Sequence, residues 1–207
     1  MILTLNTAAE PYFIALYQKN VLLKYISPIN HRNLAENLLD TIETALLPHG
    51  GLEALTGLAM CKGPGRYISL RIAATTLRTL AQVLTIPIKG FCTLEVLAQE
   101  GMSSDTLIIS ILPSYKNHYH LRLFGKTKLG MEAKTPLMHL ERESLERFVS
   151  NFKEKIYILS PGEENLRLSN QAEYIKTNLK SEAIKNLFDN DDLNATWQNF
   201  SLCYQAS

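Results

Sequence analysis

The chain has 207 residues, of which 46% are apolar and 20% are charged, and its formal net charge is +1. These values are ordinary for a globular protein and argue against disorder, which combines low hydrophobicity with high net charge. They also argue against a stand-alone nucleic-acid-binding protein, which usually carries a surplus of basic residues. A chain of this length can form one domain or two small ones.

The three cysteines, Cys61, Cys92 and Cys203, are far apart in the sequence. An odd number without close spacing predicts neither a disulfide framework nor a zinc site, so we interpret them as reduced thiols. No apolar run approaches the roughly 18 residues that a membrane span needs, and the first residues lack the features of a signal peptide. We therefore expect a cytoplasmic protein without a membrane anchor.

The first hundred residues alternate between runs typical of strands and runs typical of helices. Apolar, β-branched and aromatic residues predict strands at residues 2–5, 12–17, 21–26, 58–61 and 87–90. Helical spacing of apolar residues predicts helices at about residues 31–47, 68–84 and 93–99. The first three strands are joined by links too short for parallel crossovers, so they form an antiparallel meander. This order is that of ribonuclease-H-like domains and of the actin-like ATPases, and it predicts an α/β fold.

A polar break at residues 102–105 suggests a boundary between an N-terminal subdomain, 1–102, and a smaller C-terminal α/β subdomain, 103–207. In the second half, apolar runs predict strands at residues 107–112, 119–124 and 156–159. An amphipathic pattern predicts a helix at 140–152. The tail from Leu168 is polar and is predicted to be helical, then weakly structured through residues 189–192.

A glycine-rich turn connects a strand of buried type to the helix at 68–84. Its residues are Gly63, Pro64 and Gly65, and Arg66 and Arg71 follow. Backbone amides at a helix start can hold an anion, but the spacing matches neither a P-loop nor a dinucleotide fingerprint. A tight structural turn is the favoured interpretation, and an anion or nucleotide-phosphate loop is the alternative.

Other candidate sites are weaker. His118 and His120 share one face of a predicted strand, but no third metal ligand is evident nearby, since His139 lies beyond a turn-rich segment. Asn6 ends the first strand, where actin-like ATPases carry an Asp that helps to hold metal and phosphate. An amide is a poor magnesium ligand beside a carboxylate, which weakens an ATPase interpretation.

Residues 63–73, GPGRYISLRIA, resemble a signature of the bacterial TsaB family, also called YeaZ, which reads GPGSFTGLRIG. Residues 86–95, IPIKGFCTLE, are similar to the IPLxGVSTLE of the family, and residues 2–16 are similar to its first two strands. His31 and the helix that follows it resemble the family's HSxxLLP segment. The resemblance covers residues 1 to about 100.

The chain departs from the family pattern at several positions, which makes it similar to a divergent member. Arg66, Ile68 and Ser69 replace small or hydroxyl residues and a glycine. The family's DARxxEVY sequence is replaced by residues 112–119, LPSYKNHY, in which the tyrosine alone is kept.

The resemblance implies an actin-like, ribonuclease-H-like (ASKHA) fold with two lobes, the second one reduced. It implies a non-catalytic protein, without a cofactor, that activates the transferase TsaD in forming N6-threonylcarbamoyladenosine next to the tRNA anticodon. A TsaE-like ATPase joins the larger complex, tRNA is contacted indirectly or jointly, and a homodimer of the isolated chain is a further option. The family's contact with TsaD is a bundle of the first two helices. On their apolar and small-residue faces, the candidate partner-binding residues are Leu34, Leu38, Ile42, Ala73, Ala74, Leu77 and Ala81.

Two alternatives stay open from the sequence. The apolar helix stripes are also what a buried core requires. The chain could instead be a small actin-fold phosphotransferase or ATPase that uses the loop at 63–65. Any direct contact with tRNA is limited by the near-zero charge, although Lys116, Arg122, Lys126 and Lys128 could form a local basic edge.

Overall fold

The computed structural model describes residues 1–27, 29, 33–101, 106–128, 130–162, 166, 170–190 and 196–203. These residues pack as two units: Met1–Thr93 with the C-terminal residues from Leu179 onward, and Leu94–Asn178. The C-terminal residues 179–203 therefore belong to the first unit, whereas the sequence-based division at residue 102 assigned them to the second.

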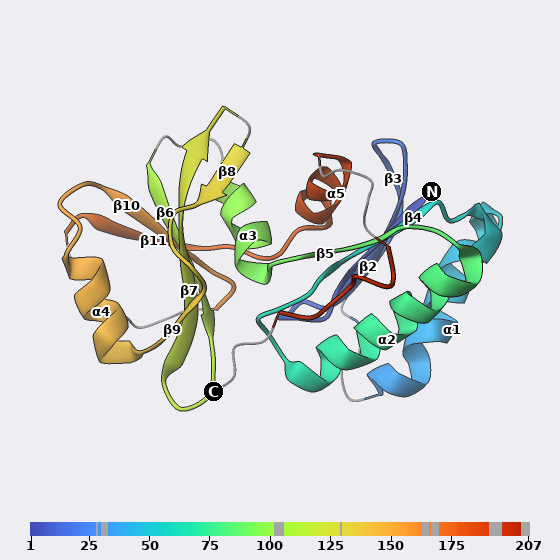
Figure 1. The fold of residues 1–207 in the computed structure, drawn as a ribbon, viewed down its shortest axis with the longest axis horizontal. Helices are drawn as coiled ribbons and strands as arrows, with labels where there is room; N and C mark the ends of the chain where they lie inside the picture. Colours follow the sequence, from blue (N-terminus) through green and yellow to red (C-terminus); the bar gives the residue numbers. More distant parts are fainter. Residues whose placement is uncertain are drawn as a thin grey trace. The chain divides into compact units, whose positions relative to one another are not determined.

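The first unit is built on a five-stranded sheet in the order β3-β2-β1-β4-β5 (Figure 1). Its strands are β1 (Ile2–Asn6), β2 (Phe13–Gln18), β3 (Val21–Ile26), β4 (Gly57–Cys61) and β5 (Ile88–Phe91). The first three strands are antiparallel, and β4 and β5 run parallel to β1. Both the predicted meander and the predicted strand positions are confirmed.

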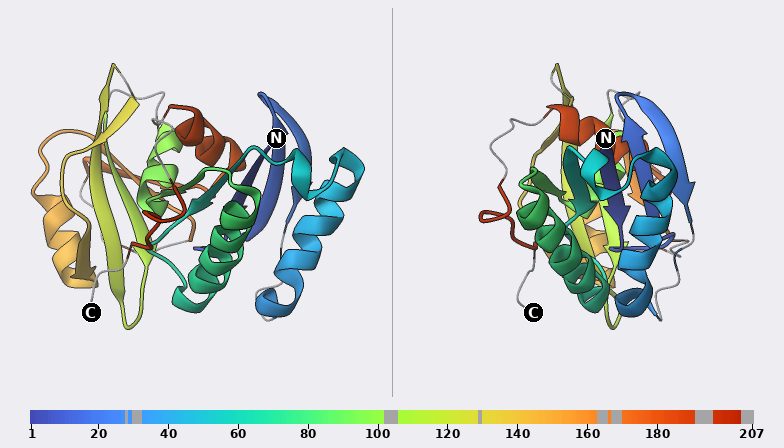
Figure 2. Two further views of the ribbon diagram at one scale, coloured as in Figure 1. Left: turned by 45° about the vertical axis from the view of Figure 1, so that its right-hand side comes forward. Right: turned by 90° about the vertical axis from the view of Figure 1, so that its right-hand side faces the viewer.

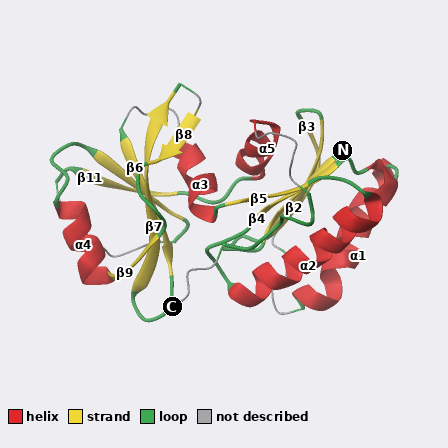
Figure 3. Cartoon of the chain, in the orientation of Figure 1, coloured by secondary structure: helices red, strands yellow, loops and turns green. Residues whose placement is uncertain are grey.

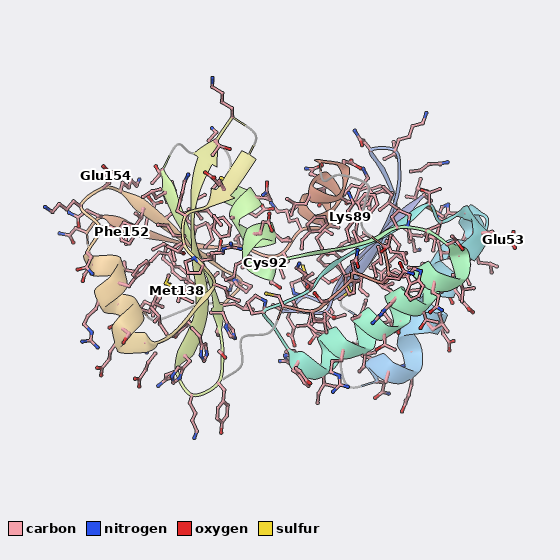
Figure 4. The ribbon with its side chains drawn as sticks, viewed as in Figure 1. Glu53, Lys89, Cys92, Met138, Phe152 and Glu154 are labelled. Carbon is pink, nitrogen blue, oxygen red and sulfur yellow. The ribbon has the colours of Figure 1, made fainter. Side chains whose placement is uncertain are left out.

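Helices cover both faces of this sheet (Figures 1 and 2). α1 (Leu34–Leu46) and α2 (Tyr67–Leu84) contact each other on one face. The short helices η1 (Leu47–His49) and η2 (Leu52–Ala54) follow α1. α5 (Ser181–Asn190) packs on the other face, where the buried Lys89 points from β5 and donates to the Phe188 carbonyl over 3.0 Å (Figure 4). The sheet core is thus closed by elements from both ends of the chain.

The second unit contains a six-stranded sheet whose main path is β11-β10-β6-β7-β8, with β9 paired to β7. Its strands are β6 (Leu107–Pro113), β7 (His118–Thr127), β8 (Gly130–Ala133), β9 (Met138–Glu141), β10 (Ile156–Ser160) and β11 (Ala172–Lys176). α4 (Arg142–Ser150) packs its Leu145 and Val149 on one face. α3 (Thr93–Ala98) and η3 (Gln99–Gly101) precede the sheet in the chain.

Several elements of the second unit differ from the sequence-based prediction. The strands β8, β9 and β11 were not predicted, and the residues from Met138 to Glu141, in part assigned to a helix, form β9 (Figure 3). The tail was expected to be helical, but its first described element is the strand β11, followed by α5. Leu168 and residues 191–192, which belong to the same prediction, lie outside the described residues.

Candidate functional site

The turn between β4 and α2 is tied to three other segments by its backbone. The Arg66 N–H donates to the Ala8 carbonyl over 2.9 Å, and the Gly63 carbonyl accepts from the Thr93 N–H, also over 2.9 Å. The Cys203 N–H donates to the Lys62 carbonyl over 2.8 Å. The first amide of the helix start is therefore used within the chain.

Close backbone approach explains both glycines of this turn. A Cβ at Gly65 would lie 2.5 Å from the Ala8 carbonyl oxygen. A Cβ at Gly63, whose φ is +107°, would lie 2.7 Å from the Cys203 carbonyl oxygen. Packing of protein backbone against both glycines therefore accounts for them without an anion, which favours the tight structural turn over the anion loop.

Asn6 is a buried structural amide at the end of β1. Its Nδ2 donates to the carbonyls of Ala9 and Pro11 over 2.8 and 2.9 Å, and its Oδ1 accepts from the Ala8 N–H over 3.0 Å. An aspartate could not donate to the two carbonyls. The amide therefore holds the loop from Ala8 to Pro11 in place, which is a positive reason for Asn at this position.

The two arginines after the turn have local partners. Arg66 lies 3.5 Å from the carboxylate of Glu10, and both side chains are more than half exposed. Arg71 donates to the Tyr67 hydroxyl over 3.2 Å, and its guanidinium lies 5.4 Å from the centre of the Tyr67 ring. The two side chains do not converge on the turn as one cluster, because each is paired with a different neighbour.

All seven residues predicted for the helix faces are buried inside the chain. Leu34, Leu38, Ile42, Ala73, Leu77 and Ala81 are 0–1% exposed, and Ala74 is 8% exposed. They form the core side of α1 and α2, so a partner cannot touch them while the chain is folded, apart from the small exposed part of Ala74. Any contact made by these two helices has to use other residues.

The outer surface of the same helices carries exposed apolar side chains. They are Leu39, Leu47, Tyr67, Ile68 and Val83, with Leu47, Ile68 and Val83 at least 73% exposed. Ile68, Ile72 and Val83 lie within about 60° of one another around α2, because the helix turns about 100° per residue. This surface could have been found from the sequence, because these apolar residues fall outside the apolar stripe that faces the core.

The electrostatic character of the two helices differs. α1 carries Glu36, Asp40 and Glu43 at helical spacing and no basic residue, whereas α2 carries two arginines and no acidic residue. The outer surface of the pair therefore combines apolar side chains with an acidic stripe on α1. Such a surface suits a protein partner whose own contact side is apolar and basic.

Three histidines stack on one face of the second sheet, which the sequence analysis did not predict. His139 of β9 lies opposite His120 of β7, and the ring centres are 4.6 Å apart. The ring of His118 also stacks on that of His139, with the ring centres 5.0 Å apart. Burial and the neighbouring His139 lower the pKa of His120 to about 4, and burial followed by the effect of His118 lowers the pKa of His139.

These rings do not form a metal centre. Nitrogen lone pairs lie in the ring planes, so stacked rings direct them side by side rather than toward a common ion. Among the described residues, no group of three or more His, Cys, Asp and Glu side chains could hold a metal ion.

The remaining candidates are simpler. Cys61, Cys92 and Cys203 form no disulfide bonds, and burial raises the pKa of the Cys61 thiol. His31 lies outside the described residues.

The predicted basic edge is split, because Lys116 precedes β7 while Lys126 and Lys128 lie at its far end, about 30 Å away for a strand of that length. None of the helices in the described residues is both long and apolar enough to span a membrane.

The sequence matches known proteins over part of its length. Residues 26–114 match the family model described as TsaD: tRNA N6-adenosine threonylcarbamoyltransferase. The chain is 32% identical, over 130 residues, to the tRNA threonylcarbamoyladenosine biosynthesis protein TsaB of Bacillus subtilis (strain 168), a match that covers 59% of this chain and 54% of that protein. It is 30% identical, over 102 residues, to the protein of the same name from Buchnera aphidicola subsp. Schizaphis graminum (strain Sg), covering 49% of this chain and 48% of that protein. The match thus spans about half the length of these curated relatives.

The fold matches over almost the whole chain. YeaZ from Pseudomonas aeruginosa superposes with a TM-score of 0.76 at 18% identity and covers 99% of both chains. A protein described as uncharacterized, with similarity to peptidase YEAZ from Pseudomonas aeruginosa, gives a TM-score of 0.76 at 19% identity and 98% coverage of both chains. The actin-like, ribonuclease-H-like fold and the resemblance to TsaB and YeaZ are thereby confirmed.

Proposed function

We propose that this chain, a divergent relative of the TsaB and YeaZ proteins, is a non-catalytic partner of a TsaD-like threonylcarbamoyltransferase. In this role it supports the formation of N6-threonylcarbamoyladenosine in tRNA next to the anticodon. The sequence similarity to proteins named for threonylcarbamoyladenosine biosynthesis supports the pathway. The match to the TsaD family model over residues 26–114 supports a common fold for the chain and its proposed partner.

The observation that carries the proposed partner role is the exposed apolar surface of α1, η1 and α2. We call Leu39, Leu47, Ile68 and Val83 the outer helix surface, and each of them is at least 42% exposed in the isolated chain. Apolar side chains that lie on adjoining helices and flank an acidic stripe are typical of a protein contact surface. Burying them against a partner would contribute about 25 cal/mol per Å² of apolar area, from which the cost of association is subtracted.

The non-catalytic part of the proposal rests on Asn6 and on the turn after β4. The alternative, a small actin-fold phosphotransferase or ATPase, needs a carboxylate at the end of β1 and room for phosphate at the glycine loop. Asn6 instead holds the loop from Ala8 to Pro11, and backbone carbonyls occupy the space in front of Gly63 and Gly65. Both features favour a structural use of this region.

The larger assembly follows from the same proposal. A TsaE-like ATPase would join the complex of the chain with its TsaD-like partner, and tRNA would be contacted jointly. In the absence of the partner, the outer helix surface of two copies could pair, which would give a homodimer of the isolated chain.

Co-purification with the TsaD-like protein from the same organism tests the proposal. The double variant Ile68→Glu with Val83→Glu places two charges on the outer helix surface and leaves the core unchanged. We expect the wild-type chain to co-elute with the transferase and the double variant to elute alone. Substitutions of buried residues such as Leu38 would unfold the chain and would not test the contact.

Val21→Glu is the matched control, because Val21 is 62% exposed on β3 of the same unit. It should keep full binding. A folded double variant that still binds the transferase would overturn the proposed surface. Magnesium-dependent ATP hydrolysis by the isolated chain would instead support the phosphotransferase alternative.

A further inference from the structure

The C-terminal residues 196–203, which we call the C-terminal strap, run beside α2 and β5 of the first unit. The strap is fixed by the hydrogen bond from the Cys203 N–H to the Lys62 carbonyl. It is also fixed by the ring of Phe200, which lies so close to Gly90 that a Cβ there would be 2.7 Å from it. Because Gly90 has no side chain, the aromatic ring can pack directly on β5.

A groove lies between the strap and α2. Tyr67, Arg71, Thr75 and Arg78 line it from the helix, and Phe200 and Ser201 line it from the strap. A second hollow, lined by Lys62, Gly90 and Asn199, shares Phe200 and Ser201 with the groove. Lys62 lines the second hollow and Arg71 and Arg78 line the groove, so cationic side chains lie in both hollows that share Phe200.

The two arginines that line the groove are each paired with an aromatic ring. The Arg71 guanidinium lies 5.4 Å from the centre of the Tyr67 ring, and that of Arg78 lies 5.9 Å from the Trp197 ring. Tyr67 is 53% exposed, and both arginines are exposed. The groove therefore presents flat apolar faces beside positive charge at the surface.

The positive charge of the groove is not balanced by its own elements. Neither α2 nor the strap contains an Asp or Glu. Within the described part of the chain, Arg71 and Arg78 form no ion pair with a carboxylate, whereas Arg66 pairs with Glu10. In a chain of net charge +1, this is a local concentration of positive charge that an anionic ligand could neutralise.

We propose that the groove between α2 and the C-terminal strap binds single-stranded RNA. Bases can stack on Tyr67 and on the half-buried Phe200, which line the groove, and on the half-buried Trp197 beside Arg78. Arg71, Arg78 and Lys62 can contact the phosphates. Base stacking on an aromatic side chain contributes about 1–3 kcal/mol per base and tolerates any sequence. The choice of RNA among polyanions rests on the proposed function, in which an anticodon loop is the substrate.

The groove is separate from the outer helix surface. Arg71 and Arg78 lie about 20° apart around α2, at about 60–80° from Ile68 and about 120–140° from Val83. The groove and the outer helix surface are therefore neighbouring parts of α2 that share none of their defining residues. RNA binding in the groove and partner binding at the outer helix surface can therefore be tested with separate substitutions.

The probe for this proposal is built into the chain, because Trp197 is its only tryptophan. The intact chain, without any transferase, is titrated with an anticodon stem-loop RNA, with a fully paired RNA duplex, and with heparin as a polyanion that has no bases. We expect the stem-loop to quench Trp197 emission and to bind at least tenfold more tightly than the duplex or heparin.

The double variant Arg71→Gln with Arg78→Gln should weaken stem-loop binding at least tenfold. It should also reduce the slope of log K against log salt by about 1.4, since each single-strand phosphate contact contributes about 0.7. The double variant Arg147→Gln with Lys153→Gln removes the same charge from exposed positions of the second unit and should bind like wild type.

Three results would overturn the RNA groove: no change in Trp197 emission with the stem-loop, equal binding of heparin and stem-loop, or unchanged binding by the folded Arg71 and Arg78 variant. Failure of the stem-loop to bind while the chain co-purifies with the transferase would leave the proposed function intact. Binding of the stem-loop without that co-purification would refute the partner role alone.

Discussion

The side-chain amide of Asn6 holds the backbone of the loop after β1 in one conformation. Sequence reasoning could predict that an amide weakens metal binding, but it could not predict that both N–H groups of this amide donate to backbone carbonyls. The hydrogen bonds connect Asn6 with residues three and five positions later, so they depend on the path of the loop rather than on any sequence period. The sequence therefore identified Asn6 as a notable residue, but its role in holding the loop could be found only from the structure.

Asn6→Asp should destabilise the chain by about 3 kcal/mol, because a buried carboxylate would face the carbonyls of Ala9 and Pro11 without a donor. Denaturant unfolding of the variant measures this free energy. The exposed Asn37→Asp, in the first turn of α1, is the control and should be neutral or slightly stabilising. Equal stability of Asn6→Asp and wild type would refute the structural role of the amide.

The histidine stack makes the second unit sensitive to acid. The pKa of His120 is about 4 in the folded chain against 6.5 for the ordinary side chain, because it is partly buried and lies beside His139. Between these two pH values the unfolded state binds more protons than the folded state. The stability supplied by neutral His120 is therefore complete above about pH 6.5 and is lost as the pH falls toward 4.

His120→Gln removes this titration and should make the stability of the β7–β9 pairing less dependent on pH. Hydrogen exchange at the backbone amides of β7 measures it between pH 7 and pH 5. His49→Gln, which changes a histidine of the first unit, should leave the pH dependence at β7 as in wild type. The same steep dependence in His120→Gln would show that other groups cause it.

At the scale of elements, strongly periodic segments were predictable and short edge strands were not. α1 and α2 each show a clear apolar stripe in the sequence, and that stripe is the core side of each helix. β8, β9 and β11 have four or five residues each and mostly half-buried side chains, so their hydrophobic alternation is weak. They are strands because they pair with β7 or β10, which a local pattern does not contain.

The turn after β4 and the C-terminal strap are in contact, although they are far apart in the sequence and no sequence pattern predicts that contact. Gly63→Ala should displace the strap, because its Cβ would meet the Cys203 carbonyl oxygen at 2.7 Å and because φ is +107°. We expect Trp197 emission to shift to the red as its ring becomes more solvated, with a loss of stability of about 2 kcal/mol.

Gly51→Ala is the matched control for this prediction. Gly51 also has a positive φ, +71°, but nothing lies within 4 Å of its Cβ position. The control should lose about 1 kcal/mol from backbone strain and keep the Trp197 emission of wild type. If both variants show wild-type emission, the strap is not held by the turn.

At the scale of the whole molecule, the two units share one strand connectivity. In each sheet three successive strands pair antiparallel, β1 to β3 in one and β6 to β8 in the other. A later strand pairs in parallel with the first of these three: β4 with β1, and β10 with β6. One more strand pairs in parallel with that later strand: β5 with β4, and β11 with β10. The sequence shows no repeat, because the connectivity is kept by pairing and burial rather than by residue identity. The α/β class, the order of strands and helices along the first unit and its antiparallel meander were therefore predictable, whereas the matching connectivity of the second sheet was not.

The residues of the candidate partner surface also could not be predicted from the sequence pattern alone. The sequence-based interpretation proposed α1 and α2 as the contact helices and chose residues on their core side, because an apolar stripe looks alike in a core and in an interface. Burial within the chain separates the two, and it leaves the outer helix surface as the proposed contact.

The most direct test of the proposed function is the threonylcarbamoyladenosine content of tRNA in the organism that encodes this chain. We expect depletion of the chain to lower that content, wild-type chain to restore it, and the folded Ile68→Glu, Val83→Glu variant to fail to restore it. Unchanged threonylcarbamoyladenosine after complete depletion, or full restoration by the double variant, would contradict the account.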